Sequence, residues 1–187
     1  MANKKRRTLT DVQEKKLMKM ITDYADAWVL LTKYDNHQVT TPKTLSRDKF
    51  VLTYEEAKEA IGIMGVKLAK KLGDSKLFGQ ERGDGLEALL GNIYQTYNQK
   101  PLYPSIEHRA AHLLYFVIKD HPFVDGNKRI GAFLFIHFLS RTNYLFNKKG
   151  ERKINDNGLV TLTLLVAESD PKEMDVMINL IMNFIGK

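Results

Sequence analysis

The sequence contains no cysteine, only one tryptophan and five prolines, and no long apolar run. Without cysteine, disulfides, thiolate zinc sites and cysteine nucleophiles are excluded, and a reducing, cytoplasmic location is predicted. No apolar stretch reaches the roughly 18–20 residues that a membrane-spanning helix needs, so no membrane partner is expected. The basic residues near the start of the chain are not followed by the apolar core of a signal peptide.

What is present is a basic chain of a size typical of one domain. Its 187 residues carry a net charge of +7, with an isoelectric point of about 9.4. Hydrophobic residues make up 43% of the chain, which is enough for a sizeable core. We expect a flexible basic N-terminus over residues 1–10 and one helical domain over residues 11–187, with its core at about 77–187. The basic cluster at residues 4–7 predicts a solvated tail, with a nucleic-acid-binding arm as the alternative.

Apolar residues recur at helical spacing along most of the chain, and few segments alternate with a period of two. The sequence therefore predicts an all-α fold. Polar segments at residues 34–52 and 143–156 are expected to be irregular loops, and residues 79–85 a loop or a short hairpin. The expected helices cover residues 11–31, 54–72, 86–97, 105–119, 127–141, 157–167 and 171–185.

The run from His121 to Arg129 combines several groups suited to phosphate chemistry. It reads His-Pro-Phe-Val-Asp-Gly-Asn-Lys-Arg and is followed at once by an apolar helical pattern, which predicts a loop that opens a helix. A helix N-terminus offers free backbone N–H groups and a positive dipole end to a phosphate. Gly126 lets the backbone approach a ligand closely, and Lys128 and Arg129 add positive charge. Histidine titrates near neutral pH, as a general base requires, and the Asp125 carboxylate is a hard ligand that suits Mg²⁺.

The same run resembles the signature of the Fic/Doc family, which is His-Pro-Phe-x-Asp-Gly-Asn, then Gly or Lys, then Arg. The similarity continues in LFGQER from Leu77, LYPS from Leu102, AAHLL from Ala110 and IGAFLF from Ile130. These segments resemble the C-terminal Fic domain of some larger bacterial virulence-associated proteins. The resemblance covers about residues 77–187. It implies a Fic fold, a helical bundle with the motif loop between two central helices and a short flap hairpin.

This resemblance implies transfer of AMP from ATP to a hydroxyl side chain of a target protein, with Mg²⁺. In the family the histidine of the motif, here His121, activates the target hydroxyl as a base, and the aspartate, here Asp125, binds the metal. Phe123 anchors the motif in the core. The residues implied to hold phosphate are Gly126, Asn127, Lys128 and Arg129. The target-docking flap falls on Gly79, Gln80, Glu81, Arg82, Gly83, Asp84 and Gly85.

Two departures from the family pattern leave the type of transfer open. AMP-transferring members carry Gly where this chain has Lys128, and a second Arg where it has Ala132. Members of the Doc type transfer the γ-phosphoryl group instead, and carry Ala at the position of Gly126. AMP transfer is the first interpretation, Doc-like phosphoryl transfer the second, and a degenerate Fic domain that only binds partners the third.

The resemblance also bears on regulation and partners. Many Fic proteins carry an inhibitory helix with the pattern Ser/Thr-x-x-x-Glu followed by Gly or Asn. Residues 10–14 and 169–173 match only the first part, because Lys15 and Met174 follow the glutamates. A separate antitoxin chain, as in a bacterial toxin–antitoxin pair, is therefore the alternative, and a homo-oligomer stays open. Similar domains often follow a DNA-binding domain, so nucleic acid is expected as a partner only through such a domain or the basic N-terminus.

Overall fold

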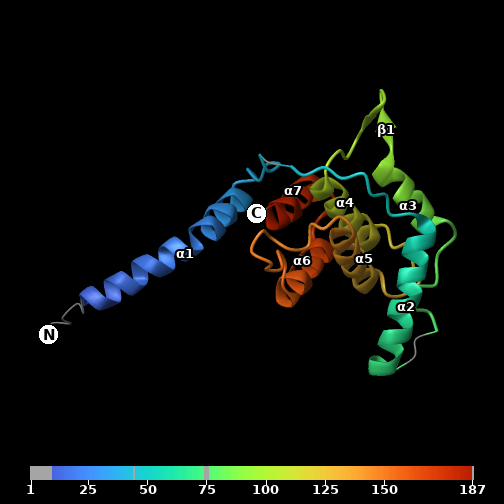
Figure 1. Cartoon of the computed structure of the whole chain (residues 1–187), viewed down its shortest axis with the longest axis horizontal. Coiled ribbons are helices and arrows are strands. Elements are labelled where there is room, and N and C mark those ends of the chain that lie inside the picture. Colours follow the sequence, from blue (N-terminus) through green and yellow to red (C-terminus); the bar gives the residue numbers. More distant parts are fainter. Residues whose placement is uncertain (1–9, 44, 74–75, 187) are drawn as a thin grey trace. The chain divides into compact units, whose positions relative to one another are not determined.

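Seven α-helices account for most of the residues that the computed structural model describes, which are 10–43, 45–73 and 76–186 (Figure 1). This confirms the predicted all-α class. The β-structure of the described residues is limited to one two-stranded hairpin and three isolated bridges. The chain divides into a first unit over residues 1–39 and a second over residues 40–187. The predicted flexible N-terminus lies outside the described residues, except for Thr10.

The first unit contains one helix, α1, Asp11–Asp35. Thr10 begins it with a capping box, in which its side chain accepts a hydrogen bond from the Gln13 backbone N–H and the Gln13 side chain accepts one from the Thr10 N–H. The helix continues past its predicted end near Leu31. Along the described chain, neither α1 nor any other helix is both long enough and apolar enough to cross a bilayer.

The second unit contains the other six helices and the hairpin. Its elements are α2 (Tyr54–Leu72), α3 (Gly85–Tyr94), β1 (Thr96–Tyr97), β2 (Lys100–Pro101), α4 (Ile106–Lys119), α5 (Asn127–Arg141), α6 (Asp156–Glu168), a 3₁₀ turn (Pro171–Glu173) and α7 (Met174–Ile185). The side chains of Thr53 and Ser105 cap α2 and α4, at the predicted starts. Asn155 caps α6, one residue earlier than the sequence indicated.

One predicted helix is shorter than expected, and a hairpin follows it. The apolar pattern predicted a helix as far as Tyr97, but α3 ends at Tyr94 and Gln95 is extended. β1 then pairs antiparallel with β2. The two turn residues, Asn98 and Gln99, have φ values of 48° and 62°, the left-handed pair that a tight hairpin turn requires. The helical prediction was wrong here because Tyr97 kept the apolar spacing while the backbone had already turned.

The core is built around α4 and α5, which lie side by side in the second unit (Figure 1). α4 is buried along most of its length and contacts α3, α5, α6 and α7. Gly131 allows the close approach of α5 to α4, since a Cβ there would lie 3.1 Å from Ile118 Cγ1 and 3.4 Å from Val117 Cβ. The chain between α4 and α5 is the motif loop, as predicted.

A fully buried carboxylate, Glu107, ties the segment before α2 to the first turn of α4. Both of its carboxylate oxygens accept a hydrogen bond from the Ser46 backbone N–H at 3.0 Å, and the Tyr144 hydroxyl donates to Oε1. Burial, and to a smaller extent the hydrogen bond to Glu107, raises the pKa of Tyr144 to about 12, so this hydroxyl stays a neutral donor. The Ser46 carbonyl accepts from the Ile106 N–H at 2.9 Å. A polar cluster therefore fixes a segment that has no regular secondary structure.

Stability is expected to fall as the pH drops from about 6.5 towards 4, because α4 buries His112 as a neutral ring. His112 is 5% exposed, stacks on the Tyr103 ring at 3.7 Å, and donates from Nδ1 to the His108 carbonyl at 2.8 Å. Burial lowers the pKa of His112 from 6.5 to about 4. At a pH between the pKa of the unfolded chain, 6.5, and that of the folded chain, about 4, His112 binds a proton only in the unfolded chain. This difference lowers the free energy of unfolding by at most about 3 kcal/mol.

Urea unfolding at about pH 7.5 and about pH 4.5 would measure this loss of stability. His112→Phe keeps the stacked ring but cannot titrate, so the loss should be smaller in that variant. Some dependence should remain, because burial also lowers the pKa of His108. Equal losses in the wild type and in His112→Phe would contradict the prediction.

Candidate active site

His121 lies at the start of the motif loop, two residues after the end of α4. Its side chain is exposed, and Nδ1 lies 3.0 Å from the carbonyl oxygen of Lys119. Because a carbonyl can only accept, Nδ1 carries the proton, and Nε2 of the neutral ring is left as the basic nitrogen. His121 has a φ of 50°, in the left-handed region that histidine enters more often than most residues. Burial raises the pKa of the adjacent Asp120 carboxyl, and the charge of His121 acts in the opposite direction.

Phe123 and Asn127 hold the motif loop from inside. The Phe123 side chain is 1% exposed and lies in the core. Asn127 Oδ1 accepts from the Phe123 backbone N–H at 2.9 Å, and Nδ2 donates to the Phe123 carbonyl at 2.8 Å. The amide of Asn127 is thus committed to the shape of the loop. A phosphate role for this residue, predicted from the sequence, would depend mainly on its backbone N–H.

The segment predicted to be the flap, residues 79–85, pairs with the motif loop instead of folding into a hairpin of its own. Three backbone bonds join the two segments: Val124 N–H to Gln80 O at 2.8 Å, Arg82 N–H to Pro122 O at 2.8 Å, and Gly79 N–H to Asp125 O at 3.1 Å. Glu81 lies opposite Phe123 in a short antiparallel bridge. Since bonding directions alternate along a strand, the N–H and C=O of Glu81 point to the outer edge of this pairing.

A polar network from α2 holds the side chain of Glu81. The Tyr54 hydroxyl donates to Glu81 Oε1 at 2.9 Å, and Lys58 Nζ donates to the Tyr54 oxygen at 2.9 Å and lies 3.7 Å from Glu81 Oε1. The hydrogen bond with Tyr54, and to a smaller extent the negative charge of Glu81, raises the pKa of Lys58. A hollow of about 260 Å³ lies beside this network, between α2 and the flap segment, and Phe78 and Phe123 also line it. Sequence reasoning missed the network because 27 residues separate Tyr54 from Glu81.

Gly126 forms the turn from the motif loop into α5. It has a φ of 94°, in the left-handed region, and no side chain caps the helix that follows. The first intrahelical bond is from the Ile130 N–H to the Gly126 carbonyl at 2.8 Å, so the N–H groups of residues 127–129 have no acceptor within the helix. The Phe78 ring packs directly against Gly126, a contact for which the sequence offered only the resemblance around Leu77.

Gly126→Ala is expected to destabilise the domain by about 2–4 kcal/mol. A Cβ at this position would lie 2.6 Å from Phe78 Cε2 and 2.7 Å from Cδ2, and alanine would also be strained at this φ. Chemical denaturation would measure the change in the free energy of unfolding. Adding Phe78→Ala removes the clash but not the strain, so the double variant should lose less than the sum of the two single losses. Strictly additive losses would rule out the clash as the cause.

Asp125 and Arg129, predicted to bind metal and phosphate, form an ion pair with each other. Arg129 Nη2 lies 3.1 Å and 3.0 Å from the two Asp125 oxygens, and the guanidinium lies 4.8 Å from the centre of the Phe78 ring. Both side chains are about 40% exposed, and Lys128 is exposed beside them. Among the described residues no three carboxylates or histidines are grouped to hold a metal ion. Mg²⁺ bound together with substrate phosphates needs only one or two carboxylates, and the partly exposed carboxylate of Asp125 fits that requirement.

The two partial matches to the inhibitory pattern have different structures. Residues 10–14 begin α1, where Thr10 serves as the cap. Residues 169–173 do not form one helix, because Ser169 is the C-cap of α6 and Pro171–Glu173 is a 3₁₀ turn. The second match therefore lacks the continuous helix that the pattern describes.

The fold and the loop define a class of helical domain in which a histidine-bearing loop joins two central helices and ends at an uncapped helix N-terminus. Residues 51–139 match the model of the Fic/DOC family. This match supports a Fic/Doc-type domain over these residues and suggests a transferase. Comparison with curated proteins and with solved structures gave no match. The family match begins at residue 51, so it includes α2 and the flap segment as well as the motif.

Proposed function

We propose that the protein transfers AMP from ATP to a hydroxyl side chain of a target protein, with Mg²⁺. The observation that supports this best is the motif loop. His121 keeps Nε2 free and exposed at one end of the loop, and the other end is a helix N-terminus with no side-chain cap. The Asn127 amide and the flap segment fix the backbone between them. A base and an anion site are thus held on one short, rigid loop, which favours a reaction that depends on positioning.

In the proposed reaction His121 Nε2 takes the proton of the target hydroxyl while the hydroxyl oxygen bonds to the α-phosphorus of ATP. The bond from that phosphorus to the bridging oxygen breaks, and pyrophosphate leaves with the electron pair. Little covalent chemistry is required of the protein, so most of the rate enhancement would come from alignment and from stabilisation of negative charge.

Phosphate binding is proposed for the first turn of α5. The backbone N–H groups that follow Gly126 and the positive end of the helix dipole would face the phosphates. Lys128 and Arg129 would add positive charge at the same place. Asp125 would hold Mg²⁺, which when bound neutralises part of the phosphate charge.

The flap segment is proposed to align the target. Its inner edge already pairs with the motif loop, whereas the N–H and C=O of Glu81 point outward. An extended target segment could add to this outer edge as another strand, which would bring its hydroxyl towards His121. The network of Glu81 with Tyr54 and Lys58 would keep that edge in place.

Doc-like transfer of the γ-phosphoryl group is the second candidate, and Lys128 favours it. Gly126 favours AMP transfer, because the Doc type carries alanine there and the packing of Phe78 leaves no room for a Cβ. Ala132 stands where AMP-transferring members carry a second arginine, so this position does not support AMP transfer. Lys128 and Gly126 therefore favour different reactions. The choice requires a measurement of which phosphorus is transferred.

The test uses ATP labelled at the α-phosphorus in one reaction and at the γ-phosphorus in another. Each reaction contains the full chain, Mg²⁺ and bacterial lysate as a source of targets, and His121→Ala is the control. α-Label on protein that is absent with the variant would support AMP transfer. γ-Label alone would support phosphoryl transfer in its place. Absence of both labels, together with absence of nucleotide binding by calorimetry, would favour a domain that only binds partners.

A further inference from the structure

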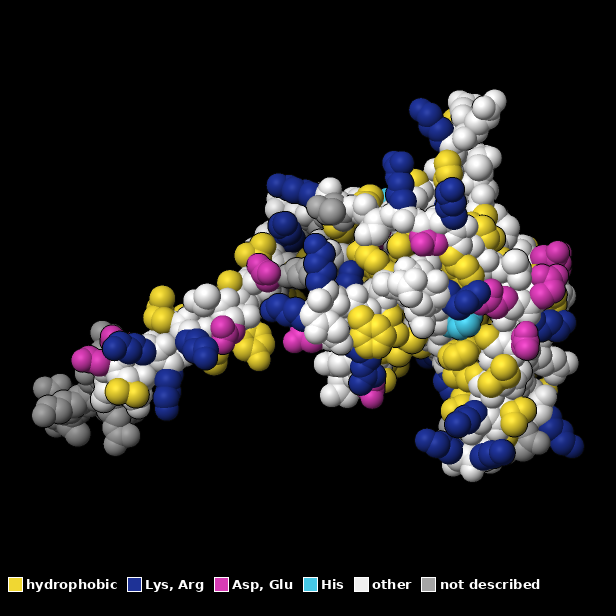
Figure 2. Space-filling view, viewed as in Figure 1, with side chains coloured by type: hydrophobic (Ala, Val, Ile, Leu, Met, Phe, Trp, Pro, Cys, Tyr) yellow, Lys and Arg dark blue, Asp and Glu magenta, His cyan; other side chains and the backbone are white. Residues whose placement is uncertain are grey.

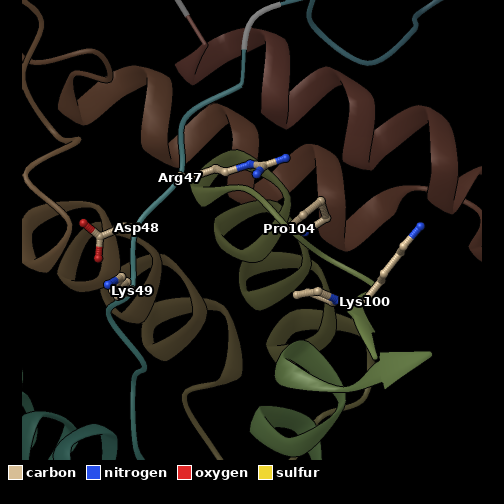
Figure 3. A pocket seen from close by; sticks show the side chains of 6 residues that line it. Arg47, Asp48, Lys49, Lys100 and Pro104 are labelled. Carbon is tan, nitrogen blue, oxygen red and sulfur yellow. The ribbon is translucent and has the colours of Figure 1, made fainter. Parts of the chain in front are cut away.

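A groove lies at the end of α4 opposite to the motif loop (Figure 3). It has a volume of about 690 Å³, and it is lined by Arg47, Asp48 and Lys49 on one side and by Lys100, Pro101 and Pro104 on the other. Pro104 directly precedes the Ser105 cap of α4, whereas the motif loop follows the other end of that helix. α4 has 14 residues, which corresponds to about 21 Å between the two places. The groove therefore lies too far away to form part of the proposed nucleotide site.

The groove carries a net positive charge. Three of its six lining residues are cations, and none of the five ion pairs between described residues involves them. Its one carboxylate, Asp48, accepts a hydrogen bond from the Phe50 backbone N–H at 2.6 Å, and Figure 3 shows it on the opposite side of the chain from Arg47. Among the charged side chains that Figure 2 shows around the β1–β2 hairpin, most are Lys or Arg.

The walls of the groove are fixed before any partner binds. The buried Glu107 carboxylate holds Ser46, the residue before Arg47. Arg109 on α4 joins both walls, since Nε donates to the Tyr103 carbonyl at 2.9 Å and Nη1 to the Asp48 carbonyl at 3.4 Å. A preformed groove loses little conformational entropy on binding, so a few charge contacts can suffice for recognition.

We propose that this groove binds an acidic segment of a partner protein. Arg47, Lys49 and Lys100 would pair with carboxylates, and Pro101 and Pro104 would give apolar contact to a side chain between them. Single-stranded nucleic acid is less suited, because it is usually held by aromatic rings on which bases stack, and no aromatic residue lines the groove. The partner would be held on the face remote from His121, leaving the motif loop open.

Fluorescence anisotropy with the full chain would test the proposal, using a labelled peptide of four Glu-Glu-Leu repeats and a labelled single-stranded DNA of equal length. No nucleotide is added, so the result does not depend on AMP transfer. Arg47→Glu combined with Lys100→Glu should weaken peptide binding by about ten-fold or more, since each change turns an attraction into a repulsion. The control is Lys67→Glu with Lys70→Glu, an equal change of charge on exposed residues of α2 outside the groove.

The control should change peptide binding by less than about two-fold, a change within the range of a screened surface charge. Circular dichroism would establish that both double variants fold. Equal losses in the two variants would overturn the proposal, because binding would then reflect net charge alone. Absence of peptide binding by the wild type would also overturn it. So would tighter binding of the DNA that depends on Arg47 and Lys100, which would assign the groove to nucleic acid.

Discussion

His121→Ala is expected to lower the rate of target modification by roughly 10²–10⁴-fold while leaving the fold and nucleotide binding intact. The side chain is exposed, so its removal leaves no cavity in the core. Its Nδ1 is committed to the Lys119 carbonyl, so Nε2 is the only ring nitrogen available to take a proton. The measurement is the initial rate of label transfer to protein, with calorimetric nucleotide affinity and the melting temperature recorded for each variant.

His121→Asn is the matched control for backbone effects. Asparagine tolerates the left-handed conformation of residue 121 but cannot act as a base, so its rate should fall as far as that of the alanine variant. Nucleotide affinity should stay within about two-fold, because the phosphate site is assigned to the start of α5. A rate for His121→Asn above about one tenth of the wild type would exclude general-base catalysis by this residue.

Phe123→Ala is expected to cost about 3–5 kcal/mol of stability and to weaken nucleotide binding as well. The side chain is 1% exposed and lies in the core. The backbone of Phe123 makes the two hydrogen bonds that shape the loop: its N–H donates to Asn127 Oδ1, and its carbonyl accepts from Asn127 Nδ2. Removing the ring leaves a cavity beside Glu81 and frees the loop to move. Since domains are stable by only about 5–15 kcal/mol, a large fraction of the stability would be lost.

Phe123→Leu separates packing from loop geometry. Leucine fills most of the space, so the cost should be about 1–2 kcal/mol and nucleotide affinity should be largely retained. Urea unfolding and calorimetry on the two variants would check both parts. A loss of less than about 1 kcal/mol for alanine would mean that the ring does not anchor the loop.

Local features of the fold could be predicted because their causes lie within a few residues of one another. The caps at Thr53 and Ser105 and the apolar spacing of α4 and α5 are of this kind. The hairpin after α3 was missed because Asn98 and Gln99 are not the Asn-Gly or Asp-Gly pair by which such turns are usually recognised. The class of the fold thus followed from periodicity, while the end of one helix did not.

The candidate site, like the fold, could be predicted from the sequence only in part. The nine residues of the motif are enough by themselves to indicate a base, a carboxylate and a helix N-terminus. They do not indicate that the Asn127 amide serves the loop, or that Arg129 pairs with Asp125 and lies over Phe78. These roles depend on side-chain directions and on a neighbour about fifty residues away, which spacing alone does not specify.

The sequence by itself determined the helical class, the family resemblance and the run that carries the proposed chemistry, since periodicity and motifs are read from neighbouring residues. Only the tertiary structure decided which segment lies against the motif loop, why position 126 must be glycine, and where the basic groove lies. Each of these arises from contacts between segments far apart in the chain, such as Phe78 with Gly126 and Glu107 with Ser46. Packing brings such residues together, and no local pattern records which ones will meet.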